Sequence, residues 1–154
     1  MKPFVLVILF ILTACSTPEP VEMPFAEGLF NIPWGCSRSF VDSVAAKDST
    51  WKYISSIVNS TNGRQIVVLQ RNEREYYLEF DNDGLLHVIN YIADHADLDT
   101  VRTRLNRFYG FPVLSDSGGN GSFERSLWQD SERALEFELM VTRKSYSLVA
   151  KHKR

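Results

Sequence analysis

The chain has 154 residues, of which 44% are hydrophobic, and 17 basic against 19 acidic side chains give a formal net charge of -2. This length suits one domain with a hydrophobic core rather than two, and the apolar content excludes global disorder. The near-neutral charge lacks the basic excess of nucleic-acid-binding proteins, so we expect no nucleic-acid partner.

The N-terminus has the composition of a secretory signal. Met1 and Lys2 give a positive start, and the apolar run FVLVILFIL follows. Nine residues rise about 14 Å as a helix, which is too short to cross a hydrocarbon core of about 30 Å. We therefore predict a signal peptide over residues 1–14, removed in the mature protein.

The end of this run has a specific pattern. Leu12, Thr13, Ala14 and Cys15 resemble the lipobox of bacterial lipoproteins, in which a leucine and two small residues precede a cysteine. The resemblance implies that the Cys15 thiol carries a diacylglycerol and that signal peptidase II cuts after Ala14. Each buried methylene contributes about 0.8 kcal/mol, so two or three acyl chains on Cys15 would hold the protein at a membrane.

The segment after Cys15 predicts a tether. Ser16 stands where an aspartate commonly retains Gram-negative lipoproteins at the inner membrane, so the resemblance implies the outer membrane, with the domain facing the periplasm. Residues 15–26 include three prolines and few groups that could build a core. Because proline disfavours helix, we expect an extended spacer, followed by a globular domain over residues 27–154.

The domain opens with a predicted helix in CSRSFVDSVAAKD. Ser39 and Asp42 fit a capping box, and one face of the helix is apolar, with Phe40, Val41, Val44 and Ala45. Cys36 has no intramolecular partner once Cys15 carries lipid. It could serve as a nucleophile or pair with another protein, but we favour a structural role at the helix start, because the three scattered histidines indicate no base.

Four strands are expected next, in residues 51–59, 64–71, 74–80 and 85–92. The third alternates apolar and polar side chains, and DNDG turns the chain into the fourth. A second helix is predicted from the helical spacing of Leu98, Val101, Leu105 and Phe108. Asp97 and Asp99 suit its first turn, while Gly110 and Pro112 end it. Its outer side is basic, with Arg102, Arg104 and Arg107, and we interpret it as a solvated face with Asp99 as local partner.

The C-terminal part is expected to be a flexible loop in SDSGGNGS, then alternating strands in RALEFELMVT and SYSLVAK. The predicted fold is therefore a single α+β domain of order α-β-β-β-β-α-β-β-β. It has an antiparallel sheet of about seven strands with two helices packed on one face.

Candidate metal sites have simpler interpretations. Asp81, Asp83 and Gly84 mimic part of an EF-hand loop, but the position of the final glutamate is Asn90 and both flanks are strands, so we favour a hairpin turn. The cluster Asp94, His95, Asp97 and Asp99 could bind a metal, but aspartates are expected at a helix start. His87 lies in a strand and is interpreted as a surface or satisfied core residue.

Short segments suggest a wider relationship. IPWGCSRSFVDSV, the tryptophan and tyrosine at 51 and 53, LEFDNDGLL and YGFP resemble small bacterial envelope lipoproteins. That group includes the small lipoprotein of the barrel-assembly machinery and the domains of β-lactamase-inhibitor protein. The resemblance implies an α+β architecture and a non-catalytic role.

The sequence therefore predicts a lipid-anchored module of the cell envelope, acting as an interaction or scaffolding protein. Its expected partners are the membrane, through the acyl chains on Cys15, and another envelope protein. We expect no catalytic residue, no metal and no cofactor. An envelope hydrolase whose site has no recognised motif is the alternative. The aromatic side chains, among them Trp34, Trp51 and Trp128, are expected mostly in the core, and any that remain on an open sheet face would suggest a contact surface.

Overall fold

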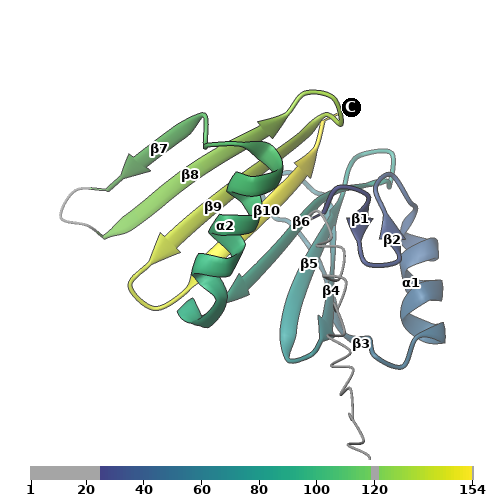
Figure 1. The fold of residues 1–154 in the computed structure, drawn as a ribbon. Helices are drawn as coiled ribbons and strands as arrows, with labels where there is room; N and C mark the ends of the chain where they lie inside the picture. Colours follow the sequence, from purple (N-terminus) through teal and green to yellow (C-terminus); the bar gives the residue numbers. More distant parts are fainter. Residues whose placement is uncertain (1–24, 119–121, 154) are drawn as a thin grey trace, which may run out of the picture.

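The computed structural model describes residues 25–118 and 122–153. The chain first forms strands β1 (Gly28–Leu29) and β2 (Ile32–Pro33), helix α1 (Arg38–Lys47) and strands β3 (Lys52–Val58), β4 (Gln65–Arg71), β5 (Arg74–Phe80) and β6 (Leu86–Ala93). It continues through the 3₁₀ turn η1 (His95–Asp97), helix α2 (Leu98–Tyr109) and strands β7 (Leu114–Ser117), β8 (Phe123–Asp130), β9 (Leu135–Thr142) and β10 (Tyr146–His152) (Figure 1).

The main sheet has eight antiparallel strands in the order β3-β4-β5-β6-β10-β9-β8-β7, and β1 pairs with β2 in a separate hairpin. The chain thus makes a helix and a four-stranded meander twice. We call α1 with β3–β6 the first unit, and η1, α2 and β7–β10 the second unit. Their last strands, β6 and β10, lie side by side, with Asn90 opposite Val149 near the middle of the pairing.

The two units also share their strand register. In the first unit Val67 lies opposite Leu78, which lies opposite Ile89. In the second unit Ser126 lies opposite Leu139, which lies opposite Leu148. All six side chains are buried, so the two meanders turn equivalent positions toward the core.

The core lies between one face of the sheet and the two helices. On β5 the predicted alternation is confirmed: Tyr76, Leu78 and Phe80 are buried, while the residues between them face the other side of the sheet. Val41 from α1 and Leu105 from α2 join the same hydrophobic cluster. This confirms the α+β class, with the two helices on one face of an antiparallel sheet. None of the described residues forms a covering layer on the opposite face of the sheet.

The strand count differs from the prediction of about seven. The predicted loop in SDSGGNGS begins with residues of β7, whose four side chains are all exposed. β7 has no alternating pattern; it forms because β8 offers an unpaired edge, with Asp116 opposite Arg125. The hairpin of β1 and β2 is a further addition to the predicted fold, because two-residue strands are too short to show a period.

The helix ends test the capping predictions. α1 is capped by Ser37, whose Oγ accepts a hydrogen bond from the Phe40 backbone N–H at 3.4 Å, so the predicted capping box of Ser39 and Asp42 is wrong. The reason is that a bridge between Ser37 and Leu85 fixes the chain in extended form just before the helix. Phe40, which the helical spacing places on the packed face, is 44% exposed.

For α2, the predicted start near Asp97 and the end at Gly110 are confirmed. Gly110 has a φ of 76°, a conformation that costs glycine little. Among the described residues, no helix combines the length and the apolarity needed to span a membrane.

Residues 1–24 lie outside the described residues, and with them Leu12, Thr13, Ala14, Cys15 and most of the predicted tether. The last two residues of that predicted tether, Phe25 and Ala26, are described. Phe25 packs its ring against Tyr91, with 6.0 Å between centroids, and its carbonyl accepts a hydrogen bond from the Trp34 indole at 2.8 Å. Packed structure therefore begins at least two residues before the predicted boundary at residue 27.

Candidate functional site

The uncovered face of the sheet is hollowed. A hollow of about 840 Å³ spans the junction of the two units. Strands β4, β5, β6, β9 and β10 line it, together with Arg64 from the loop before β4. We call this surface the open-face hollow, defined by Arg64, Ile66, Tyr77, Glu79, His87, Val88, Asn90, Glu138, Met140, Ser147, Val149, Lys151, His152 and Lys153.

The floor of the open-face hollow is largely apolar. Val88 and Val149 are half-buried, and Met140 is 39% exposed. Two polar side chains among them are joined to each other, since the Ser147 hydroxyl donates to Asn90 Oδ1 at 2.9 Å. Such an apolar centre on an uncovered sheet is a typical feature of a contact surface.

One rim of the hollow is formed by Arg64, Glu79 and His87. Arg64 Nη1 lies 3.2 Å from Glu79 Oε1 and 2.9 Å from His87 Nε2. Because a guanidinium only donates, Nε2 must accept, and the imidazole is therefore neutral. Burial, and then the nearby Arg64 charge, lower the pKa of His87. Its Nδ1 is buried without a hydrogen-bond partner among the described residues.

The opposite rim is a cluster of paired charges. Arg125 Nε lies 2.7 Å from Glu138 Oε1, Lys151 Nζ lies 3.4 Å from Glu138 Oε2, and Lys153 Nζ lies 2.5 Å from Glu136 Oε2. The hydrogen bond from Lys153 is the main cause that lowers the pKa of Glu136. The hollow thus has an apolar floor between two rims whose charged side chains are paired with each other. Such a surface can contact a partner without burying an unpaired charge.

A second hollow of about 770 Å³ lies on the helix side, between α2 and the β1–β2 hairpin. We call it the central cleft. Tyr76 and Tyr91 line its floor, and Arg74, Arg104 and Arg133 are among the side chains around it. It too lies where the two units meet, because Arg74 comes from β5 whereas Arg104 comes from α2.

A polar network that reaches from the surface to buried tyrosines runs beside this cleft. Asp97 pairs with Arg74 and accepts a hydrogen bond from Tyr146 Oη at 2.5 Å, and Tyr146 Oη lies 3.2 Å from Tyr91 Oη. Burial raises the pKa of Tyr91 to about 12. Burial, followed by the hydrogen bond to Asp97, raises the pKa of Tyr146 as well. Both phenols are therefore protonated hydrogen-bond donors at neutral pH.

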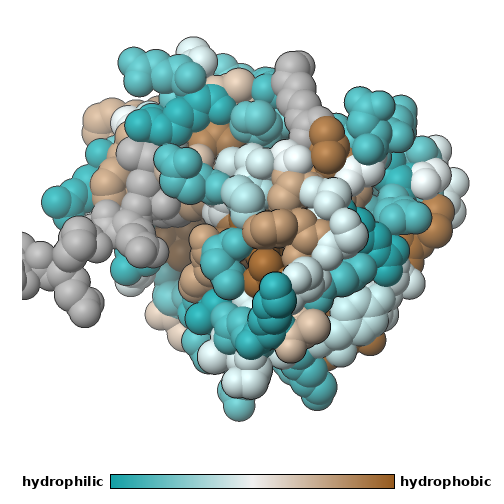
Figure 2. All heavy atoms as spheres, turned by 90° about the vertical axis from the view of Figure 1, so that its right-hand side faces the viewer, coloured by the Kyte–Doolittle hydropathy of each residue, from teal (hydrophilic) through white to brown (hydrophobic). Residues whose placement is uncertain are grey.

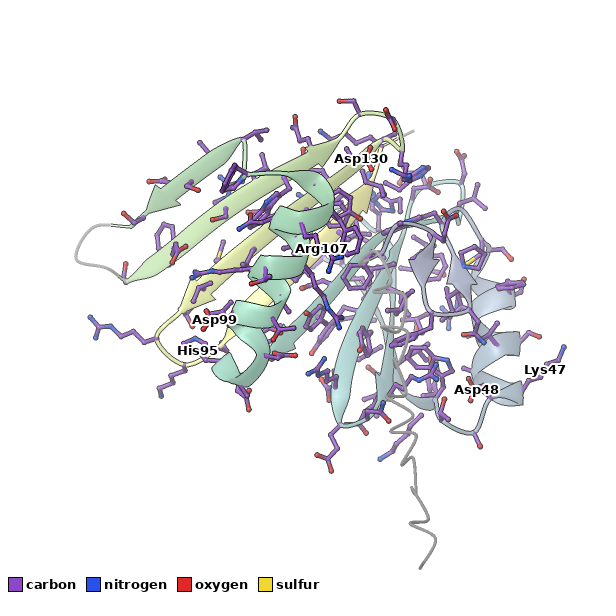
Figure 3. All side chains as sticks on the ribbon, in the orientation of Figure 1. Lys47, Asp48, His95, Asp99, Arg107 and Asp130 are labelled. Atoms are coloured by element: carbon purple, nitrogen blue, oxygen red, sulfur yellow. The ribbon has the colours of Figure 1, made fainter. Side chains whose placement is uncertain are left out.

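The aspartates singled out in the sequence do not gather around a common centre. Asp94 caps η1 by accepting from the Ala96 N–H at 2.9 Å, and Asp97 takes part in the tyrosine network. His95 and Asp99 are exposed where α2 begins, with Arg107 near the opposite end of the helix (Figure 3). Among residues 25–118 and 122–153, no group of three or more acidic, histidine or cysteine side chains is placed to hold a metal ion.

The EF-hand-like segment is a hairpin turn between β5 and β6, as predicted. Asp81 Oδ1 accepts from the backbone N–H groups of Asp83 and Leu85 at 3.0 and 2.9 Å. Gly84 takes a φ of 75°. The Asp81 side chain therefore stabilises the turn itself.

Cys36 forms no disulfide with the described residues. It is half-buried and packs against the hydrophobic core, and burial raises the pKa of its thiol. A raised pKa reduces the thiolate population that nucleophilic attack requires.

The three arginines of α2 have different surroundings, so the prediction of a common solvated face paired with Asp99 needs correction. Arg102 Nη2 lies 2.6 Å from Glu124 Oε2 on β8. Arg104 lines the central cleft, and Arg107 lies over the Phe108 ring at 5.9 Å from its centroid. The local sequence could not indicate Glu124 as a partner, because α2 and β8 meet only in the fold.

The tryptophans mostly fill the core, as expected. Trp51 and Trp128 are buried, and Trp34 is half-buried and stacks on His152, with 5.9 Å between ring centroids. On the open face, Tyr77 is half-buried and its hydroxyl donates to Glu75 at 3.0 Å. The side of the molecule that carries α1 shows small apolar groups separated by polar residues, with no continuous apolar patch in that view (Figure 2).

The sequence alone did not locate either hollow. Alternation identifies which residues of β6 and β10 share a face, but nothing local indicates that these two strands are neighbours. The one sequence signal for this pairing was the repeated order of one helix followed by strands. That repeat places the last strand of each unit in an equivalent position.

No protein-family model matches the sequence, and no curated protein matches it significantly. Among solved structures, the fold is similar to that of a DUF4309 family protein, YjgB, from Bacillus subtilis. The TM-score is 0.51 at 12% sequence identity, over 76% of this chain and 78% of the other. At this identity the likeness concerns the fold alone. The resemblance to barrel-assembly lipoproteins and β-lactamase-inhibitor-like domains stays a prediction.

Proposed function

We propose that the protein is a lipid-anchored cell-envelope module that binds another envelope protein through its open-face hollow. The sequence supports the anchor, because Leu12 to Ala14 before Cys15 match a lipobox. Acyl chains on Cys15 would hold the domain at the outer membrane, facing the periplasm. The role is that of an interaction or scaffolding protein and requires no chemistry of its own.

The observation that carries the proposal is the combination of apolar floor and paired rims on an uncovered sheet. Val88, Val149 and Met140 offer apolar contact area, and Ser147 and Asn90 among them are hydrogen-bonded to each other. Burial of apolar side chains against a partner favours binding. Charges at the rim of an interface set the orientation and the specificity of that binding. A partner with an apolar ridge flanked by polar groups would fit this surface.

Site-specific photo-crosslinking tests the contact surface. A photoreactive amino acid is placed at Val88 or at Met140 in cells, and at Lys144 in the exposed β9–β10 turn as a matched control. We expect the two open-face positions to capture the same envelope protein and Lys144 to capture none. The capture should be lost when Val149→Glu places a charge on the floor of a folded protein. Capture that survives this change, or no adduct shared by the two positions, would contradict the proposal.

The anchor has its own test. Cys15→Ala should abolish incorporation of a labelled fatty acid and remove the protein from the detergent phase, because no thiol remains to accept the diacylglycerol. Cys36→Ser is the matched control and should retain both properties. Normal acylation of the Cys15→Ala protein would refute the lipobox assignment without affecting the crosslinking result.

A further inference from the structure

We propose that the central cleft binds an anionic small molecule, whose phosphate or carboxylate group pairs with Arg104. This site is separate from the open-face hollow and lies on the other face of the sheet. A volume of about 770 Å³ falls within the range of pockets for small ligands.

The charges around the cleft favour an anion. Arg74, Arg104 and Arg133 line it, against the acidic side chains of Glu27 and Asp97. Counted over these lining side chains, the excess is one positive charge, in a chain whose formal net charge is -2. A guanidinium presents a planar fork of donors that matches the oxygens of phosphate and carboxylate.

The three guanidinium groups are not equally available. Arg74 is held by Asp97, and Arg133 Nη1 lies 2.9 Å from Asp130 Oδ2. Arg104 has no ion pair or hydrogen bond with the described residues. Thr100 lies one helical turn before Arg104 on α2, and both residues line the cleft. Arg104 is therefore the group with free capacity for a ligand.

The rest of the cleft suits the body of such a ligand. Phe25, Phe30 and Val101 contribute apolar wall, and Tyr76 and Tyr91 line the floor. The tyrosine hydroxyls stay protonated at neutral pH and add no negative charge that would repel an anion. A ligand that carries a phosphate or carboxylate on an aromatic or short apolar group would pair with Arg104 and also contact the apolar wall. Soluble metabolites and phospholipid headgroups both offer this chemistry.

Calorimetric titration of the full lipidated chain in a non-ionic detergent tests the site. The probes are phenyl phosphate for a soluble aromatic anion and glycerol 3-phosphate for a headgroup, with phenol and glycerol as their neutral counterparts. We expect at least one anion to bind saturably and its neutral counterpart to bind at least about tenfold more weakly, because the ion pair is lost. Preference for phenyl phosphate assigns a soluble ligand, and preference for glycerol 3-phosphate assigns a headgroup.

Two variants on α2 locate the binding. Arg104→Gln should weaken the anion at least about tenfold, whereas Arg107→Gln, the same change on the same helix, should leave the affinity within about twofold. Both side chains are exposed, so circular dichroism should show that both variants fold. Absence of saturable binding by either anion overturns the proposal, and so does equal affinity in Arg104→Gln and the unchanged protein. Either result leaves the open-face proposal standing.

Discussion

The hydroxyl of Tyr146 donates a hydrogen bond to Asp97, with 2.5 Å between Oη and Oδ1, although 49 residues separate the two in the chain. The other carboxylate oxygen of Asp97 pairs with Arg74. Tyr91 completes the network through Tyr146. Arg74 and Tyr91 belong to the first unit, and Asp97 and Tyr146 to the second. The network therefore links the first unit to the second on the face of the sheet that carries the two helices.

Replacement of Asp97 should reveal this connection. Asp97→Ala removes two charge-assisted interactions, each of which contributes about 1.5–3 kcal/mol when formed. The loss is reduced because Tyr146 keeps Tyr91 as a hydrogen-bond partner and because water hydrates the exposed part of Arg74. We expect a loss of about 2 kcal/mol in the free energy of unfolding by urea. Asp99→Ala, at an exposed position in the first turn of α2, should cost no more than about 1 kcal/mol. Equal losses would show that Asp97 acts only on the helix dipole.

The role of Asp97 marks the boundary of what the sequence can predict. Periodicity and turn residues indicated both helices and most of the longer strands, because those signals are local: Tyr76, Leu78 and Phe80 alternate, and Gly110 follows the last turn of α2. The segment of β8 was not among the strands located in the sequence. Asp97 suits a helix start equally well with or without Tyr146. Both hollows lie where β6 pairs with β10. The sequence of neither strand indicates which strand it pairs with. Local sequence patterns therefore could not predict sites whose residues come from both units.

The start of α1 provides a matched pair of serines. Ser37→Ala removes the hydroxyl that accepts from the Phe40 N–H, and loss of such an N-cap typically costs about 1 kcal/mol. Ser39→Ala tests the position that the sequence pattern favours, and it should change the free energy of unfolding by less than about 0.5 kcal/mol. Thermal or urea unfolding of both variants separates the two positions. A larger loss from Ser39→Ala would restore the predicted capping box.

His87 should make the protein less stable in acid. Burial lowers its pKa in the folded state below the ordinary value near 6.5, so the unfolded chain binds the proton more readily. The stabilisation is complete above about pH 6.5 and is lost as the pH falls through 6.5 toward the folded pKa, with a slope of at most about 1.4 kcal/mol per pH unit. The measurement is the free energy of unfolding by urea between pH 8 and pH 5.

Removal of the imidazole tests this effect directly. His87→Gln should flatten the acid side of the stability profile, because the group that prefers to be neutral in the fold is gone. Parallel profiles for the variant and the unchanged protein would mean that other groups cause the acid sensitivity.

Cys36 should behave as a slow, structural thiol. Burial raises its pKa, so little thiolate is present at neutral pH, and the side chain packs against the core. We expect iodoacetamide to modify Cys36 at pH 7.4 more slowly in the native protein than in urea. Cys36→Ser should cost about 1 kcal/mol of stability through the polar hydroxyl in a half-buried site. Native-state alkylation as fast as in urea, or a disulfide-linked partner trapped through Cys36, would contradict this role.

The N-terminal hairpin depends on the absence of a side chain at Gly28. This residue has a φ of 125°, and a Cβ there would lie 2.2 Å from the Ile32 carbonyl oxygen and 2.8 Å from the Pro33 Cα. Both atoms are backbone, so the clash cannot be relieved by rotating a side chain. Gly28→Ala should therefore open the pairing of β1 with β2 and lower the free energy of unfolding by at least about 2 kcal/mol.

Gly63 separates this clash from the cost of the backbone conformation. It also has a positive φ, 72°, but a Cβ at this position in the loop before β4 would meet nothing within 4 Å. Gly63→Ala should thus cost only the left-handed conformation of an alanine, about 1 kcal/mol. The β1–β2 hairpin also forms one wall of the central cleft, so Gly28→Ala should weaken binding of the anionic probe, whereas Gly63→Ala should not. Equal stability losses in the two variants would show that the hairpin tolerates a side chain at Gly28.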